Sequence, residues 1–524
     1  MKFLPTFFTL LITCSVQAQS IDVTHYKFQL EVSDRSDSIY GEATIHFSYL
    51  RPASAISFNL QQSTNGKGMT ISSVTLSGKA APFEQKNNAV IITSTSSKDS
   101  TGTAVIKYSG IPTDGLIISK NKFGKRTFFS DNWPDRAAKW IPCVDEPRDK
   151  SPVTFVVIAP SHYQVISNGL LTGRTDLPGQ RSRTEWTETI PLPTKIMVVG
   201  IAEFATEQSG MVGNIPVTTW VFPENKAIGF GDYGIAPPIL KWLQDYIGPF
   251  PYKKLAHVQS RTMYGGMENG SAIFYAENSV NGLRNKEELI AHETAHQYFG
   301  DMVTERNFAH VWLSEGFATY MAHLYIESRY GKDSLAAEMQ IDRNKVIAFS
   351  RSNKLPMIDS VSPLMERLNP NSYEKGSWLL HMLRNQTGDS TFRKVIRQYY
   401  ATYAGRNVLS ADLQAVFEKF TGKSFQSFFD QWLYTPGQPD LDIQWRYNAT
   451  GRNIEITITQ LQEKPFNFTL PFNIVRGTNS PTYISTQVTR KVETFRIPVK
   501  ERPDALVADP RITLLYSGKV TAKN

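Results

Sequence analysis

The chain has 524 residues, of which 41% are hydrophobic and 20% are charged. This length and balance suit about two to four globular domains and exclude a disordered or fibrous protein. The net charge of +8 is spread along the sequence without a dense block of Lys and Arg, so nucleic-acid binding has little support.

Residues 1–18 are predicted to be a secretory signal. They combine the basic Lys2, an apolar run to about Thr13 and a small-residue cleavage site ending at Ala18. We expect an exported protein of the periplasm or extracellular space. An alternative makes Cys14 a lipid attachment site, but Thr13 is a poor residue immediately before such a cysteine.

Cleavage after Ala18 would leave Cys143 as the single cysteine. An intramolecular disulfide is then impossible, so packing and a bound metal must stabilise the exported chain. A membrane-spanning helix needs roughly 18 consecutive apolar residues, and no later run approaches that length. We therefore expect no transmembrane segment.

Residues 19–207 are predicted to form an all-β domain. Strand-like segments such as HYKFQLEV, EATIHFSYL and VTFVVIAP alternate with turn residues, including Asn65-Gly66 and Asn168-Gly169. Antiparallel sheets that each bury one face would pack as a saddle or sandwich.

Helical periods dominate residues 208–438, for example in KEELIAHETAHQYFG and HVWLSEGFATYMAHLYIESRY. Alternation returns in residues 439–524, which are predicted to form a small C-terminal β-sandwich. The expected fold class is multidomain α+β, with a mostly helical central domain between two β domains.

The central domain contains the motif H-E-x-x-H at His292, Glu293 and His296. Residues i and i+4 share one helix face, so both imidazoles can grip one metal ion. Asn285 and Glu288 are predicted to form a capping box at the start of this helix. The alternative is a pair of helix histidines with structural hydrogen bonds.

A catalytic zinc uses three protein ligands and keeps a fourth position for water, so a further ligand is needed. Glu315 lies in a second helical stretch that can pack antiparallel to the first. The competing pattern, with glycine at 299 and histidine at 302, is excluded by Phe299 and Met302. We predict one Zn²⁺ per chain on His292, His296 and Glu315, with Glu293 as general base.

Upstream, Gly265, Gly266, Met267, Glu268 and Asn269 precede a short apolar segment. With H-E-x-x-H and the downstream glutamate, this segment resembles the aminopeptidase N and leukotriene-hydrolase family of gluzincins. The resemblance implies a thermolysin-like catalytic domain in which residues 265–269 bind the substrate and Glu268 holds its free α-amine.

The segment NPNSYEKGSWLLHML resembles the tyrosine segment of that family, which implies that Tyr373 stabilises the oxyanion. Trp133 stands where the family usually has a second amine contact, and Asp131 is a speculative substitute. Further departures are Tyr298, Asp301, Ser314 and Gly266, and none of these removes a ligand or catalytic group.

The resemblance implies a zinc aminopeptidase acting on peptides with a free N-terminal amine. A zinc endopeptidase and a catalytically inactive peptide-binding relative are the alternatives. The chain ends after the small β domain, where many relatives continue into a large helical domain, so we expect a more open cleft. The side-chain preference and the oligomeric state are not readable from the sequence.

Overall fold

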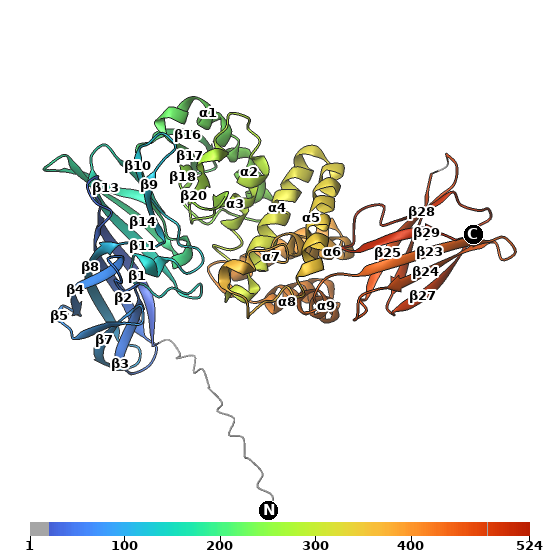
Figure 1. Cartoon of the computed structure of the whole chain (residues 1–524), viewed down its shortest axis with the longest axis horizontal. Helices are drawn as coiled ribbons and strands as arrows, with labels where there is room; N and C mark the ends of the chain where they lie inside the picture. The colour runs from blue at the N-terminus through green and yellow to red at the C-terminus, as the bar shows by residue number, and fades with distance from the viewer. Residues whose placement is uncertain (1–19, 479, 524) are drawn as a thin grey trace, which may run out of the picture.

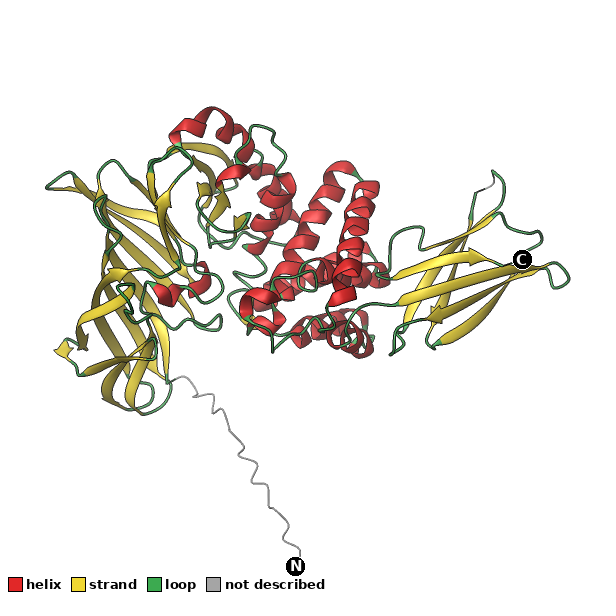
Figure 2. Ribbon diagram, viewed as in Figure 1, coloured by secondary structure: helices red, strands yellow, loops and turns green. Residues whose placement is uncertain are grey.

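The computed structural model describes residues 20–478 and 480–523. The predicted signal at 1–18 and Cys14 lie outside these residues. A β-rich part, a helical part and a second β part follow one another along the long axis (Figures 1 and 2). The multidomain α+β fold class is thereby confirmed, while the domain boundaries at residues 207 and 438 stay predictions.

A mixed sheet forms the centre of the N-terminal part. Among the described residues, eight strands pair in the order β13-β14-β11-β1-β2-β8-β4-β5. They are β1 (Ile21–Glu31), β2 (Ile39–Tyr49), β4 (Gly68–Leu76), β5 (Lys79–Ala80), β8 (Thr101–Ile111), β11 (Lys150–Pro160), β13 (Leu170–Leu177) and β14 (Arg181–Pro193).

The expectation of purely antiparallel sheets is wrong for one pair. β1 runs parallel to β11, with Tyr26 opposite Val153 and Glu31 opposite Ile158. Parallel neighbours need a long crossover, and here the chain from β2 to β10 provides it. Alternation within each strand predicted which face is buried but carried no information about this pairing.

Two smaller sheets complete the N-terminal part. One has the order β3-β7-β6 and the other β12-β15-β10-β9. Their strands are β3 (Ala53–Asn59), β6 (Phe83–Lys86), β7 (Ala89–Ser96), β9 (Leu116–Lys120), β10 (Arg126–Ser130), β12 (Gln164–Ser167) and β15 (Val199–Ala202).

The central part begins with a β-sheet, although the sequence of residues 208–438 predicted a mostly helical domain. Its order is β16-β17-β18-β20-β19, with β16 (Ala205–Val212), β17 (Ile215–Val221), β18 (Leu255–Ser260), β19 (Gly266–Met267) and β20 (Ala272–Ala276). Every residue of β18 is buried, so this strand has no alternation to reveal it. Only the apolar segment after Asn269, which is β20, was anticipated.

Helices form the remainder of the central part. They are α1 (Lys226–Tyr233), α2 (Ala236–Tyr246), α3 (Glu287–His296), α4 (Trp312–Tyr330), α5 (Lys332–Ser352), α6 (Glu374–Thr387), α7 (Asp389–Tyr403), α8 (Ser410–Thr421) and α9 (Gln426–Tyr434). A short parallel pair, β21 (Thr304–Glu305) and β22 (Asn407–Val408), joins two of the loops.

Helices α4 and α6 pack closely through two glycines. A Cβ atom built on Gly316 would lie 2.7 Å from Cα of Gly376, and one built on Gly376 would lie 2.8 Å from Cα of Gly316. Glycine at both positions therefore permits the close approach of these helices. Glu315 directly precedes this contact on α4, and Tyr373 directly precedes α6.

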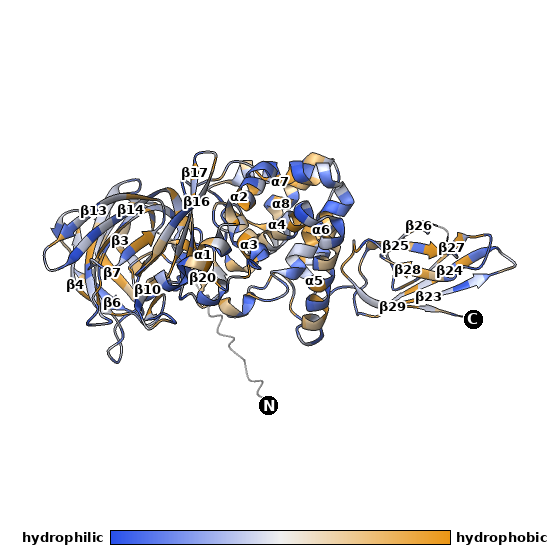
Figure 3. Ribbon diagram, turned by 90° about the horizontal axis from the view of Figure 1, so that it is seen from above, coloured by the Kyte–Doolittle hydropathy of each residue, from blue (hydrophilic) through white to orange (hydrophobic). Residues whose placement is uncertain are grey.

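The C-terminal part packs two sheets, β27-β24-β23-β29 and β26-β25-β28. The strands are β23 (Asp440–Asn448), β24 (Asn453–Gln460), β25 (Phe468–Val475), β26 (Thr482–Val488), β27 (Val492–Pro498), β28 (Ala505–Ala508) and β29 (Ser517–Ala522). Hydrophobic residues lie along the strands of both β parts and on the helices between them (Figure 3). None of the described helices is long and apolar enough to cross a membrane.

Lys195 and Lys150 fasten the N-terminal part to the central part. Lys195 is 1% exposed, and its Nζ lies 2.5 Å from Oε1 of the equally buried Glu305. Nζ of Lys150 donates to the carbonyl oxygens of Asp301 and Met302. Because these partners follow directly after the H-E-x-x-H helix, the β part helps to hold the end of that helix.

Candidate active site

Helix α3 positions the H-E-x-x-H motif. The predicted capping box is wrong, because the helix begins at Glu287 and the residue at its cap is Lys286, with no side-chain hydrogen bond. The Asn285 side chain instead accepts a hydrogen bond from Asn281. Two acidic residues in the first turn, Glu287 and Glu288, complement the helix dipole in place of the cap.

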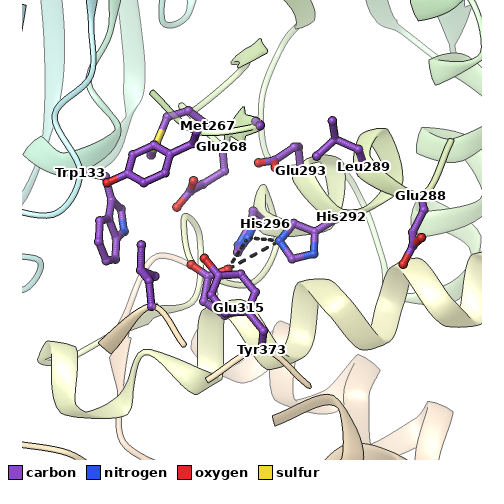
Figure 4. Close-up of a pocket in the computed structure, with 14 residues that line it drawn as sticks. Trp133, Met267, Glu268, Glu288, Leu289, His292, Glu293, His296, Glu315 and Tyr373 are labelled. Carbon is purple, nitrogen blue, oxygen red and sulfur yellow. Dashed lines mark hydrogen bonds and ion pairs between the residues drawn. The ribbon is translucent and has the colours of Figure 1, made fainter. Parts of the chain in front are cut away.

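The structure brings His292, His296 and Glu315 together (Figure 4). Nε2 of His296 lies 3.0 Å from Nε2 of His292 and 3.2 Å from Oε2 of Glu315, and the third separation is 3.6 Å. A tetrahedral zinc about 2.0–2.1 Å from each ligand would separate ligand atoms by about 3.3 Å. Two imidazoles and one carboxylate at these distances fit zinc.

Hydrogen bonds orient the two histidines. Nδ1 of His296 lies 3.1 Å from both the carbonyl oxygen of Phe299 and Oγ of Ser314. Nδ1 of His292 is 3.5 Å from the hydroxyl of Thr319. A proton on Nδ1, donated to the Phe299 carbonyl, leaves the Nε2 lone pair of His296 directed at the metal position.

The electrostatics of the three residues favour a cation. Burial alone would lower the pKa of His296, but the carboxylates of Glu315 and Glu268 outweigh burial and raise this pKa to about 10. Burial would raise the pKa of Glu315, yet the two histidines hold it well below its usual range. The carboxylates thus stabilise positive charge where the three ligand atoms meet.

Glu293 is 5% exposed and lies beside Gly266 of β19. A Cβ atom on Gly266 would be 2.2 Å from Oε1 of Glu293, so the carboxylate occupies space that only glycine leaves free. Burial raises the pKa of Glu293 well above its ordinary value, and Glu268 and Glu315 raise it further. This environment makes Glu293 a stronger base than an exposed glutamate, as the role of general base requires.

Residues 265–268 form one wall of the site, and Glu268 points into it (Figure 4), whereas Asn269 is fully buried and does not line the cavity. Glu268 is 5% exposed, and its Oε1 is buried with no hydrogen-bond partner among the described residues. Burial raises the pKa of Glu268. An unpartnered buried carboxylate is energetically costly, so this arrangement favours a cationic ligand.

Gln297, which the sequence analysis did not single out, ties α3 to this wall. Its Nε2 donates to the carbonyl oxygen of Glu268 at 2.8 Å, and its Oε1 accepts from the backbone N–H of Ser271 at 2.7 Å. The side chain thus fixes Glu268 relative to the motif helix. A glutamine directly after the second histidine gives no sequence signal of this role, because its partners lie 26–29 residues away.

Tyr373 lies at the start of α6, and its ring stacks against that of His292 with centroids 6.1 Å apart. Burial raises the pKa of its hydroxyl well above the usual value, with Glu315 and Glu268 adding to the effect. The hydroxyl therefore stays protonated and is available as a hydrogen-bond donor.

All of the predicted site residues except Asn269 line a cavity of about 390 Å³. Apolar and aromatic side chains complete its walls, namely Trp133, Tyr264, Leu289 and Leu368. Trp133 is 2% exposed and packs edge-on against Tyr264 and Phe308.

Asp131 does not replace the missing amine contact. It is absent from the cavity wall, and both of its carboxylate oxygens are engaged. Oδ1 accepts from Arg136, while Oδ2 accepts from the hydroxyl of Thr262 and the N–H of Met263. The speculative assignment is therefore wrong, and Asp131 instead anchors the loop that leads into Gly265.

The central sheet, the helices and the cluster of His292, His296 and Glu315 together define a metallopeptidase-like domain with a candidate metal centre of two histidines and one glutamate. Residues 232–432 match the Peptidase family M1 domain, and residues 23–196 match the Peptidase M1 N-terminal domain. The chain belongs to the peptidase M1 family.

Relatives that the chain resembles are aminopeptidases. It is 27% identical over 407 residues to "Probable aminopeptidase 2" of Sulfurisphaera tokodaii, covering 74% of this chain and 51% of that protein. It is 28% identical over 338 residues to "Aminopeptidase N" of Oryctolagus cuniculus, covering 59% and 35% respectively. The chain thus spans about half or less of the length of these relatives.

The crystal structure of an M1 zinc metallopeptidase from Deinococcus radiodurans has a similar fold. Its TM-score is 0.69 at 24% sequence identity, and the match covers 80% of this chain and 95% of that one. The family implies zinc, which agrees with the fit of the three ligands.

Proposed function

We propose that this protein is a zinc-dependent aminopeptidase that removes the N-terminal residue from peptides, with one zinc ion per chain. The observation that carries the proposal is the buried, unpartnered carboxylate of Glu268 beside the metal ligands. A substrate α-ammonium would satisfy this carboxylate, and its position would locate the scissile bond one residue away. Peptides with a free N-terminal amine are accordingly the proposed substrates.

A zinc ion bound by His292, His296 and Glu315 would acidify water and polarise the substrate carbonyl. Glu293 would accept the proton of the attacking water and later pass it to the leaving amine. The protonated hydroxyl of Tyr373 would donate a hydrogen bond to the oxygen that gains negative charge. Gln297 would keep Glu268 aligned with these groups.

The test is hydrolysis of amino-acid anilides compared with amine-acetylated peptides. We expect cleavage of free-amine substrates alone, with loss of activity in Glu293→Gln and after treatment with a chelator. Cleavage of acetylated peptides would make the protein an endopeptidase, and no cleavage of any substrate would favour the inactive peptide-binding relative.

Glu268→Gln tests the amine contact directly, because it removes the charge and keeps the shape. Loss of one charge-assisted hydrogen bond should lower kcat/KM for free-amine substrates about 10- to 100-fold. Glu224→Gln, which removes an exposed glutamate on the 3₁₀ turn Pro223–Asn225, is the matched control. Equal activity of the wild type and Glu268→Gln would contradict the proposal that Glu268 binds the substrate amine.

Export belongs to the same proposal. Its support is the sequence of residues 1–18, which has the order of charge, apolar run and small residues that signal peptidase recognises. N-terminal sequencing of protein secreted into the periplasm should begin at Gln19. A mature protein that still begins at Met1 would contradict export by this route.

A further inference from the structure

A second group of metal-ligating side chains lies where α3, α4 and α5 meet. Glu288 comes from α3, His323 from α4 and Glu338 from α5, and one ligand atom of each lies within 4.8 Å of the others. The ligand atoms of His292, His296 and Glu315 lie closer together, at 3.0–3.6 Å. Glu288 lines the active-site cavity but lies apart from His292 and His296 (Figure 4).

His323 is the buried centre of this group. Its side chain is 2% exposed, and its Nε2 lies 2.8 Å from Oδ2 of Asp342, which is itself buried. In the neutral imidazole, Asp342 holds the proton on Nε2 and leaves the lone pair of Nδ1 for a metal ion. A carboxylate that orients a histidine through its distal nitrogen is the usual support of a metal-binding imidazole.

Nδ1 of His323 is buried and has no hydrogen-bond partner among the described residues. It faces Oε1 of Glu288 at 3.5 Å, close to the separation of about 3.3 Å between two ligands of a tetrahedral ion. Burial would lower the pKa of His323, but the carboxylates of Asp342, Glu288 and Glu338 raise it, so this group stabilises a positive charge where the three side chains meet. Nζ of Lys345 lies 3.8 Å from Oδ1 of Asp342 and 3.0 Å from Oε1 of Glu374, and its charge also acts on Glu288 and Glu338.

We propose that Glu288, His323 and Glu338 form a second divalent-metal site that takes a zinc ion at the rim of the substrate cavity. One imidazole and two carboxylates are a donor set that zinc accepts. The side chain of Glu288 is 51% exposed, so an ion can enter from solvent and water can complete its coordination. The partial exposure also makes this site weaker than the buried catalytic one.

Occupancy has a consequence for catalysis that rests on the proposed aminopeptidase function. The free carboxylate of Glu288 adds negative charge to the cavity wall, and that of Glu338 adds to it from close by, so together they attract the ammonium of a peptide. A bound dication would cancel that charge. Excess zinc should therefore raise KM and leave kcat unchanged, because the group lies apart from the reacting atoms.

The experiment measures metal content directly. Zinc-loaded enzyme, freed of excess metal, is dialysed against free zinc from nanomolar to high micromolar concentration, and bound zinc is counted by mass spectrometry. The wild type should take up a second ion per chain. Glu338→Gln should lower the affinity for this ion more than about tenfold while retaining the first. Asp333→Asn, which removes an exposed charge from the same helix, should behave as the wild type.

A wild type that binds only one zinc, or a Glu338→Gln variant that binds two as tightly, would overturn the site. The count does not depend on catalysis, so it separates failure of this proposal from failure of the proposed function. If peptides are cleaved, excess zinc should raise KM in the wild type and not in Glu338→Gln. An equal rise in both would overturn the effect on substrate binding.

Discussion

At Gly266, the absence of a side chain determines where the proposed general base can sit. The Glu293 carboxylate fills the position of the missing Cβ, at 2.2 Å, whereas a Cβ on the neighbouring Gly265 would meet nothing within 4 Å. Gly266→Ala must therefore displace Glu293, and displacement of a reacting group by about 1 Å costs roughly 100-fold in rate. Steady-state kinetics should show a fall in kcat of that order.

Gly173→Ala in β13 is the control for this change, because its added methyl group would lie no closer than 3.8 Å to a neighbouring atom and Gly173 does not line the cavity. Its kcat should remain close to that of the wild type. The displaced atoms are the end of a flexible side chain, so the thermal stability of Gly266→Ala should change little. Full activity of Gly266→Ala would show that Glu293 acts from another position or does not act as the base.

The meeting of His292 with His296 could be predicted from the sequence because it depends on local geometry. The helix repeat alone aligns His292 with His296, and one further carboxylate at a suitable distance completes the set. The partners of Asp131 and Gln297 could not be predicted, since they come from loops distant in the chain. Side chains whose roles depend on tertiary contacts leave no periodic signal.

At the scale of elements, the glycine contact between α4 and α6 sets the distance between Glu315 and Tyr373. Gly316→Ala would place a methyl group 2.7 Å from Cα of Gly376, a backbone atom that cannot move without its helix. Overpacking of this kind costs about 1–3 kcal/mol. We expect a lower unfolding temperature, together with weaker zinc retention during dialysis against a chelator, because Glu315 moves with α4.

Ser328→Ala on the exposed face of α4 provides the comparison, since it alters the same helix away from the contact. It should retain zinc as the wild type does. If Gly316→Ala retains zinc and unfolds at the wild-type temperature, then α4 and α6 accommodate the added methyl group without moving Glu315.

Element types were predictable where one face is buried, as in β1, whose alternate residues are buried. They were not predictable for β18, which is buried on both faces. The start of α3 was misassigned for a different reason. The pattern of Asn285 and Glu288 is compatible with a capping box, but the hydrogen bond between Asn281 and Asn285 takes the capping side chain away.

For the molecule as a whole, buried lysines make stability depend on pH. Lys375 is 1% exposed, and burial lowers its pKa to about 7. Between this pKa and the unfolded-state pKa of about 10.4, Lys375 is protonated in the unfolded chain but neutral in the folded one. The free energy of unfolding therefore rises with pH across this range, and the destabilising effect of burying Lys375 becomes smaller. Lys375→Met should be most stabilising at pH 7 and below, with the advantage shrinking by about 1.4 kcal/mol per pH unit towards pH 10.

Calorimetric unfolding of the zinc-loaded protein across this pH range measures the difference. Lys423→Met, at an exposed position, should give a difference from the wild type that does not vary with pH. An advantage of Lys375→Met that is constant from pH 7 to pH 10 would mean that Lys375 remains charged in the folded protein.

The parallel pairing of β1 with β11 also constrains the order in which the chain can fold during synthesis. β1 leaves the ribosome early, but one of its two neighbours in the sheet is not made until about residue 160. Until then one edge of β1 presents unpaired backbone groups, which attract other extended chains. Nascent or translocating chains should therefore depend on chaperones until β11 has been synthesised. β11 begins with Lys150, the residue that contacts Asp301 of the central part.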